Sequence, residues 1–232
     1  MRLFETLAAL GHEQVVLCSD PAAAYRAVIA LHSTRLGPAV GGTRLRPYAR
    51  DEDALADALG LSRAMTLKSA LAGLPFGGGK AVVLQPAGAF DRAALFEAHG
   101  RAIEALGGRF VTGEDVGVSP DDLELTRRRT RYVAGLASGA GNPAPYTARG
   151  VLSAMRAAAG RAWGSPDLAG RRVALQGCGA VGASLAAALK ALPLREAGSA
   201  LALWRWGQPQ VRSGAFDPEL RRIWEDRLRT AQ

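Results

Sequence analysis

The sequence predicts a protein of the α/β class with two domains. Three observations lead to this prediction: strand-like and helix-like segments alternate, a glycine-broken strand–turn–helix pattern occupies 171–192, and a linker-like stretch, SGAGNPAPY, occupies 138–146. With 232 residues, of which 48% are hydrophobic and 22% charged, the chain has a globular composition and enough length for a substantial core. We therefore expect one domain over 1–140 and a second over 146–232.

The first half alternates between strand and helix patterns. It predicts a helix over 2–10, strands over 13–20 and 24–34, a glycine-broken turn into a short strand over 37–44, and a helix over 51–71. GLPFGGGK at 73–80 is expected to interrupt regular structure before a buried strand at 81–84. The remaining expected elements are a helix over 91–106, a strand and loop over 110–117, a helix from Ser119 and a short strand at 132–135.

The second half contains a helix on each side of one predicted strand. Thr147 is expected to cap a helix that runs through 150–163, and the strand, glycine turn and helix of 171–192 follow. Near the end of the chain, Asp217 caps a predicted amphipathic helix with Pro218 at its first position. The apolar face of that helix needs a partner surface.

The net charge of +8 would favour a nucleic-acid partner only if the cations clustered. Most of the 29 basic residues are scattered arginines, and the dense run at 127–131 fits a solvated helix end. We therefore expect no nucleic-acid partner. Only Lys68, Lys80 and Lys190 are lysines, and in a chain that otherwise uses arginine, Lys68 and Lys80 indicate a need for amine chemistry.

Location and metal binding follow from what the sequence lacks. It has no apolar run long enough for a membrane span and no signal-peptide pattern at its start, so a cytoplasmic location is expected. Cys18 and Cys178 lack the spacing of a disulfide framework or zinc site, and His12, His32 and His99 lack metal-ligand spacing. We interpret these five side chains as packing or surface residues and expect no metal.

A glycine pattern in VALQGCGAVGASL predicts a dinucleotide site. Gly177 would make the tight turn after the strand, Gly179 would let the backbone approach a pyrophosphate, and Gly182 would let helix and strand pack closely, with Ala180 and Val181 between them. The acidic residue expected about twenty positions later, to hold the ribose hydroxyls, is absent. Arg205, between Trp204 and Trp206, offers only weak support for a 2′-phosphate. The cofactor is therefore expected to be NAD, with NADP not excluded.

A second constellation combines Lys68, the GGGK segment ending at Lys80, and the acidic pair Glu114 and Asp115. A lysine behind three glycines and before an apolar strand is expected to be partly desolvated, which lowers its pKa toward values useful for a base. A second lysine nearby would lower that pKa further and could pair with a substrate carboxylate, while Asp115 could relay protons. A surface lysine or a helix-capping aspartate is the alternative reading of each residue alone.

Five segments together resemble the Glu/Leu/Phe/Val amino-acid dehydrogenase family, within it the leucine and phenylalanine dehydrogenase branch. They are LGPAVGGTRL at 36–45, AMTLKSALAGLPFGGGKAVV at 64–83, GRFVTGEDVG at 108–117, GNPAPYTARGV at 141–151 and VALQGCGAVG at 173–182. The resemblance covers residues 1 to about 198. It implies an N-terminal α/β substrate domain of the dimerisation type, followed by a truncated Rossmann-like dinucleotide-binding domain.

The resemblance also implies residue roles. Lys68 would bind the substrate α-carboxylate, Lys80 would activate the water that attacks the imino carbon, and Asp115 would exchange protons with the amine. Gly41 and Gly42 would let the backbone lie against the substrate, and Thr147 would contact the nicotinamide. The reaction would convert an amino acid into its 2-oxo acid and ammonia, with the cofactor taking the hydride.

Two positions bear on substrate choice. Val40 stands where glutamate-specific members carry a lysine for the side-chain carboxylate, so an apolar amino acid such as leucine, valine or phenylalanine is expected here. Gly113 stands where leucine-type relatives carry alanine. Because glycine has no Cβ, the expected pocket has more room and slightly favours a larger substrate side chain such as that of phenylalanine.

The chain departs from the family in length and in its last residues. Relatives are longer, and from about 199 the expected second strand with its terminal acid is replaced by ALALWRWGQPQVRSGAF. A frameshift or premature stop is our hypothesis for this tail, and loss of activity through truncation is one expected consequence. The alternative function is a non-catalytic assembly or regulatory subunit that binds full-length dehydrogenase. The expected partners are the amino acid, the 2-oxo acid and other subunits in a homo- or hetero-oligomer, with no membrane.

Overall fold

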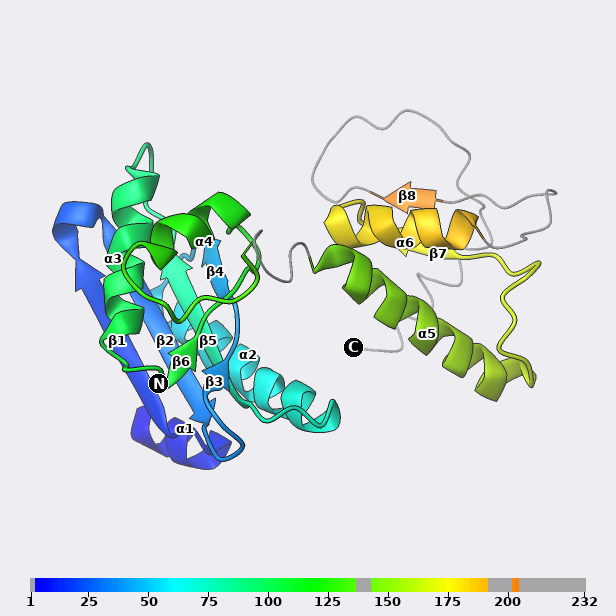
Figure 1. The fold of residues 1–232 in the computed structure, drawn as a ribbon, viewed down its shortest axis with the longest axis horizontal. Helices are drawn as coiled ribbons and strands as arrows, with labels where there is room; N and C mark the ends of the chain where they lie inside the picture. The colour runs from blue at the N-terminus through cyan, green and yellow to red at the C-terminus, as the bar shows by residue number, and fades with distance from the viewer. Residues whose placement is uncertain (1–2, 137–142, 192–201, 205–232) are drawn as a thin grey trace. The chain divides into compact units, whose positions relative to one another are not determined.

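A computed structural model of the protein describes residues 3–136, 143–191 and 202–204 (Figure 1). The chain divides into two compact units, Met1–Gly141 and Asn142–Gln232. Most of the expected linker and the helix expected from Asp217 lie outside the described residues. Within the described residues, no helix has the length and apolar character needed to cross a bilayer.

The first unit is built on a mixed six-stranded sheet. Its strands are β1 (Gln14–Asp20), β2 (Tyr25–Ser33), β3 (Ala39–Val40), β4 (Thr43–Arg46), β5 (Gly77–Leu84) and β6 (Phe110–Val111), and a short 3₁₀ turn, η1 (Pro21–Ala23), joins the first two. The strand order is β1-β2-β5-β3-β6, with β4 also paired to β5. β1, β2 and β5 are antiparallel neighbours, whereas β3 and β4 pair parallel to successive parts of β5. The segment from Ala39 to Arg46 is therefore one strand interrupted at Gly41 and Gly42.

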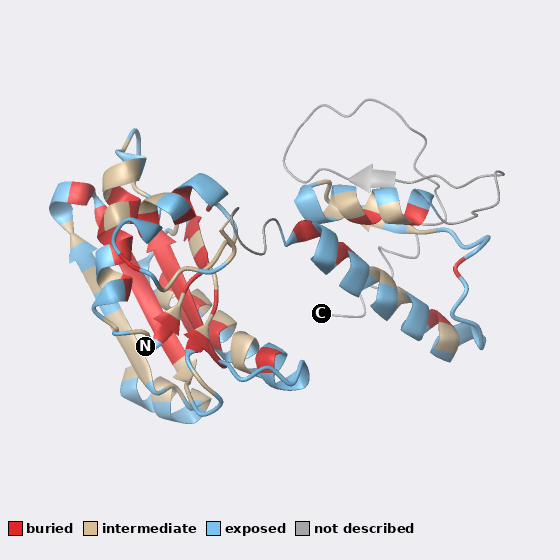
Figure 2. Cartoon of the chain, in the orientation of Figure 1, coloured by how far each residue is buried: buried red, intermediate tan, exposed pale blue. Residues whose placement is uncertain are grey.

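Helices cover both faces of this sheet. Side chains alternate along β2, so Val28 and Ala30 face α2 (Asp51–Leu71) and α1 (Leu3–Leu10). Ile29 and Leu31 point to the opposite face, where they pack in one core cluster with residues of α3 (Arg92–Glu104). α4 (Pro120–Arg127) lies beside α3 and adds Leu123 to the core. Figure 2 shows the result, with the central strands buried between the helices.

The GGGK segment is part of a strand, so the expectation that residues 73–80 interrupt regular structure is wrong for 77–80. All eight residues of β5 are buried. A Cβ at Gly77 would overlap the carbonyl oxygen of Ser33, and one at Gly78 would overlap the backbone nitrogen of Thr66. A Cβ at Gly79 would lie 2.7 Å from the Phe110 ring. These glycines therefore allow β5 to pack closely against its neighbours, and glycine marks close approach here rather than a break.

The helix ends of the first unit follow the sequence signals. α2 spans the expected residues, and the side chain of Asp91 accepts a hydrogen bond from the backbone N–H of Ala94 as the N-cap of α3. Ser119 and Asp122 form a capping box at the start of α4. The short strand expected at 132–135 is reduced to a single isolated bridge between Thr112 and Val133.

The second unit contains α5 (Ala144–Trp163), β7 (Ala174–Gln176), α6 (Ala180–Lys190) and β8 (Ala202–Trp204). α5 begins before Thr147, whose hydroxyl donates to the carbonyl of Pro143 from within the helix, so the expected capping role of Thr147 is wrong. β8 pairs parallel to β7, which gives a β–α–β arrangement. A short strand is thus present at 202–204, within the segment predicted to depart from the family, and Trp204 rather than an acidic residue stands at its end.

Close packing at Gly78 provides a test of the fold. Gly78→Ala should lower the free energy of unfolding by about 1–3 kcal/mol, because β5 and α2 must separate to admit the methyl group. Gly60→Ala is the matched control, since Gly60 is exposed within α2 and no atom of the described residues lies within 4 Å of its Cβ position. It should be neutral or stabilising by up to about 1 kcal/mol. Urea denaturation measures both. Equal stability of the two variants would show that the strand and helix are not in close contact.

Candidate active site

Lys80 lies in the middle of the first unit's sheet. It is the fourth residue of β5 and pairs with Ala30 of β2, and its side chain is only 5% exposed. Its Nζ lies 3.1 Å from Oδ2 of Asp115. A buried ammonium group is costly without an ionised partner, so this contact accounts for how the lysine is tolerated at that position.

Asp115 is brought to Lys80 by close backbone packing. The backbone N–H of Thr43 donates to the carbonyl of Gly113 at 2.9 Å, and Thr43 forms a parallel bridge with Glu114. A Cβ at Gly42 would lie 3.0 Å from the Cβ of Asp115, and one at Gly41 would overlap the carbonyl oxygen of Gly79. Gly41 and Gly42 therefore have a structural reason to be glycine, because they let the interrupted strand sit between β5 and the Asp115 loop.

Arg44 is a third charged residue of the site, beside Lys80 and Asp115, and the sequence did not predict it. Its Nε donates to Oδ2 of Asp115 at 2.8 Å, the oxygen that also contacts Lys80. Its Nη1 donates to both carboxylate oxygens of Asp57 at 2.9 and 3.2 Å, and the Tyr48 hydroxyl donates to Asp57 at 2.5 Å. Arg44 stands within the GGTR segment, but nothing in the sequence indicated that Asp57, thirteen residues later on α2, would meet it.

The pKa values of this cluster follow from burial and mutual charge. Burial lowers the pKa of Lys80, the charge of Asp115 opposes this, and the nearby Arg44 lowers it further, with a net decrease. Burial alone would raise the pKa of Asp115, but the charge of Lys80 and the hydrogen bond from Arg44 outweigh it and hold that pKa below its usual range. The site therefore pairs an ionised carboxylate with an amine that releases its proton more readily than usual. The neighbouring cation is Arg44, where the sequence had suggested Lys68.

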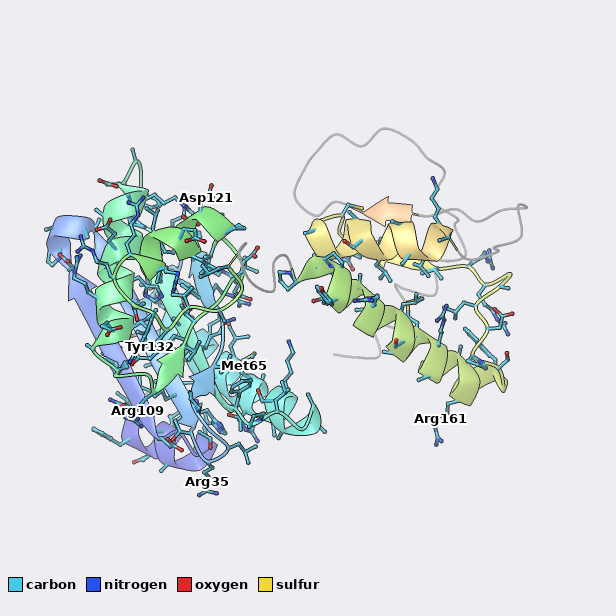
Figure 3. The ribbon with its side chains drawn as sticks, in the orientation of Figure 1. Arg35, Met65, Arg109, Asp121, Tyr132 and Arg161 are labelled. Carbon is cyan, nitrogen blue, oxygen red and sulfur yellow. The ribbon has the colours of Figure 1, made fainter. Side chains whose placement is uncertain are left out.

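The other residues expected to bind substrate lie on α2, on β3 and in the loop after β6. Met65, labelled on α2 in Figure 3, has its Cγ 3.4 Å from the Cβ position of Gly41. Lys68 is exposed in the last turn of α2, three residues beyond Met65 and so on a neighbouring part of the same helix face. Val40 is half-buried in β3. Among the described residues, Gly113 has only the Ala134 carbonyl near its Cβ position, at 3.5 Å, so an alanine would fit there.

A buried chain of hydrogen bonds supports the strand that carries Arg44. The Thr43 hydroxyl contacts Nε2 of His99 at 2.7 Å and the Thr112 hydroxyl at 2.6 Å, while Nδ1 of His99 contacts the Tyr25 hydroxyl at 2.9 Å. Burial lowers the pKa of His99 to about 3, so the ring is neutral at ordinary pH. His99, predicted from the sequence to be a packing or surface residue, is buried and anchors β4 through Thr43.

The residues expected to bind a cofactor lie in the second unit. Gly177 follows β7 with φ +88°, and a Cβ at Gly182 would overlap its carbonyl oxygen. Gly179 is the N-cap of α6, and within the part of the chain that the structure describes it has no side-chain cap and no atom within 4 Å of its Cβ position. Ala180 and Val181 are exposed in the first turn. Among the described residues, no side chain caps this helix N-terminus, and a helix N-terminus of this kind fits a phosphate. Thr147 is exposed in the first turn of α5.

Comparison with known proteins identifies the family. A sequence profile described as "Glu/Leu/Phe/Val dehydrogenase, dimerisation domain" matches residues 12–132, which is more than half of the chain and most of the first unit. The chain belongs to the Glu/Leu/Phe/Val dehydrogenase family. The match covers the strands and loops that assemble Lys80, Asp115 and Arg44, so the resemblance seen in the sequence motifs is confirmed.

Members of this family with high similarity act on several amino acids. The chain is 50% identical over 175 residues to valine dehydrogenase of Streptomyces virginiae, covering 74% of this chain and 49% of that one. It is 46% identical over 184 residues to leucine dehydrogenase of Geobacillus stearothermophilus, covering 78% and 50%. The solved structure of L-tryptophan dehydrogenase from Nostoc punctiforme matches with 44% identity and a TM-score of 0.65, covering 83% and 55%. The chain thus spans about half the length of these dehydrogenases.

Titration of His99 gives a pH-dependent prediction. Its pKa is lower in the folded state than in the unfolded chain, so its stabilising contribution is complete above the unfolded value of 6.5 and is lost as the pH falls toward 3. His99→Gln cannot take up this proton and should lose less stability between pH 7 and 4. The difference should approach about 1.4 kcal/mol per pH unit at most. Urea denaturation across this range measures it, and parallel curves for the two proteins would contradict the assignment.

Proposed function

We propose that this chain binds an apolar L-amino acid and supports its oxidative deamination to the 2-oxo acid and ammonia, with NAD as the hydride acceptor. The observation that carries the proposal is the buried contact between Lys80 and Asp115, in which an amine of lowered pKa meets an ionised carboxylate. Such a pair can hold and move protons at neutral pH. Membership of an amino-acid dehydrogenase family supports the same chemistry.

Each charged group has a distinct proposed role. Lys80 in its neutral form accepts a proton from the water that adds to the imino carbon, because burial lowers the pKa of Lys80 and so favours the neutral amine. Asp115 exchanges protons with the amine that arrives or departs. Lys68, as an exposed cation on α2, pairs with the α-carboxylate. Together, these three groups match the charges of an amino-acid zwitterion.

The second unit would hold the dinucleotide. Gly177, Gly179 and Gly182 leave the N-terminus of α6 open to a pyrophosphate, and Ala180 and Val181 present their backbone N–H groups there. Thr147 is proposed to contact the nicotinamide. The bound cofactor supplies the hydride acceptor, while the protein contributes binding and orientation. Parallel titrations with NAD and NADP test which of the two nucleotides binds.

Substrate choice is proposed to follow from an apolar pocket. Val40 offers no charge to a side-chain carboxylate, so glutamate would leave a carboxylate unpaired. The names of the similar enzymes, valine, leucine and L-tryptophan dehydrogenase, all specify amino acids without a charged side chain. These observations support an aliphatic or aromatic substrate.

Removing either proton-handling group should abolish most turnover. Lys80→Gln and Asp115→Asn should each reduce kcat by at least about 100-fold, the usual contribution of a positioned acid or base. Absorbance of reduced nicotinamide with valine, leucine, phenylalanine or tryptophan as substrate measures the effect. Lys190→Gln, on an exposed residue at the end of α6, is the matched control and should retain wild-type turnover.

If wild-type turnover is present and both site variants retain it, the proposed roles of Lys80 and Asp115 are wrong. If the wild-type chain shows no turnover with any of the four amino acids, the proposed activity of this chain is wrong.

A substrate panel tests the pocket separately. The wild type should give a higher kcat/KM with leucine, valine and phenylalanine than with glutamate. Gly113→Ala adds one methyl group where space exists and should reduce kcat/KM for phenylalanine relative to valine by about 10-fold. A preference for glutamate would refute the argument from Val40, and an unchanged ratio in Gly113→Ala would show that this position does not face the side chain.

Subunit assembly is a second proposed role, because residues 12–132 match a domain described as a dimerisation domain. In this role the first unit binds other copies of this chain or full-length dehydrogenase subunits. Light scattering of the purified chain, and co-purification with a full-length dehydrogenase, test it. A monomer that binds no such subunit would exclude it.

A further inference from the structure

Arg44 connects two carboxylates that lie on different elements. It extends from β4, with Nε bound to Asp115 on the loop after β6 and Nη1 bound to Asp57 on α2. The Tyr48 hydroxyl donates to the oxygen of Asp57 that also receives the 2.9 Å bond from Arg44. The side chains of Arg44, Asp57 and Asp115 are 17%, 25% and 23% exposed, so water competes only partly for these bonds.

We propose that Arg44 is a positioning residue of the candidate active site: anchored by Asp57 and Tyr48, it fixes the carboxylate of Asp115 through Oδ2. This inference rests on the proposed function for the role of Asp115. Both cations, Arg44 and Lys80, contact Oδ2, and among the described residues no hydrogen bond reaches Oδ1. The held carboxylate therefore presents Oδ1 as the oxygen available to the substrate amine.

Geometry explains why an arginine is suited to this place. A guanidinium is planar and rigid, so two of its nitrogens can bind two carboxylates in fixed directions, whereas the single ammonium group of a lysine cannot. The terminal torsion of an aspartate side chain is soft, so a carboxylate bound by Lys80 alone could rotate. Asp57 fixes the guanidinium, which in turn prevents that rotation.

Two substitutions test the inference through the ionisation of Lys80. The charge of Arg44 lowers the pKa of Lys80, so Arg44→Gln should move that pKa upward. The measurement is the pH dependence of acetylation of Lys80 by trace acetic anhydride, read by peptide mass spectrometry with exposed Lys190 as internal standard. Arg50→Gln removes a guanidinium from an exposed pair with Asp53 and is the matched control, which should leave the Lys80 profile unchanged.

Asp57→Asn separates positioning from a simple charge effect because the two predict opposite signs. The negative charge of Asp57 raises the pKa of Lys80, so its removal alone should move the acetylation midpoint of Lys80 to lower pH. If Asp57 anchors Arg44, the freed guanidinium leaves Asp115 and Lys80, and the midpoint should instead move to higher pH, as in Arg44→Gln. A downward or absent shift overturns the inference, and circular dichroism confirms that each variant is folded.

The outcome is independent of turnover. Acetylation is measured on the chain without substrate or cofactor, so it reports on the anchored arginine even if no amino acid is oxidised. Where the wild type is active, Asp57→Asn should lower kcat with little change in KM and shift the pH profile of kcat with the Lys80 midpoint. An upward shift of the acetylation midpoint in Asp57→Asn, without turnover by the wild type, would support the positioning role of Arg44 and contradict the proposed function. Turnover together with a downward shift would support the proposed function and contradict the positioning role. If Arg44→Gln does not fold, the Asp57→Asn result decides alone.

Discussion

The buried ammonium group of Lys80 is the constraint on which the rest of the first unit depends. Placing a charge at the centre of a sheet is costly, and the structure offsets that cost by bringing Asp115 to 3.1 Å. This approach requires the interrupted strand to lie tightly between β5 and the Asp115 loop, which is why Gly41, Gly42 and Gly79 lack a Cβ. The glycine-rich motifs and the charged pair are thus parts of one packing arrangement.

The charged side chains around Lys80 sum to zero net charge when all of them are ionised. Lys80 and Arg44 contribute two positive charges, and Asp57 and Asp115 two negative ones, so the partly buried network closes without net charge. Because Oδ2 of Asp115 is shared by both cations, loss of either one changes the field at the other. The proposed chemistry uses this coupling: a lysine that is neutralised more readily than usual stands beside a carboxylate that stays ionised.

Glycine performs different tasks in different parts of the chain. In β5, Gly77 to Gly79 are buried and allow neighbouring elements to approach, whereas Gly179, at the start of α6, has no described atom within 4 Å of its Cβ position. The first arrangement brings β5 into close contact with its neighbours, which is what places Lys80 beside Asp115. Gly113 belongs to neither group, since an alanine fits there, and this makes it the position at which a substitution should change selectivity without disturbing the fold.

The sequence by itself determined the order of most helices and strands, because apolar periodicity and capping residues such as Asp91 and Ser119 are local signals. It also indicated Lys80 and Asp115, since a rare lysine directly after three glycines and an acidic pair at 114–115 can be recognised from the order of residues alone. Tertiary structure alone decided that 77–80 is a strand, that Arg44 and not Lys68 is the cation beside Lys80, and that Asp57 and Tyr48 hold Arg44. Those outcomes depend on contacts between β4, β5, α2 and the loop after β6, and no periodicity within a single segment encodes which side chains of four segments will meet.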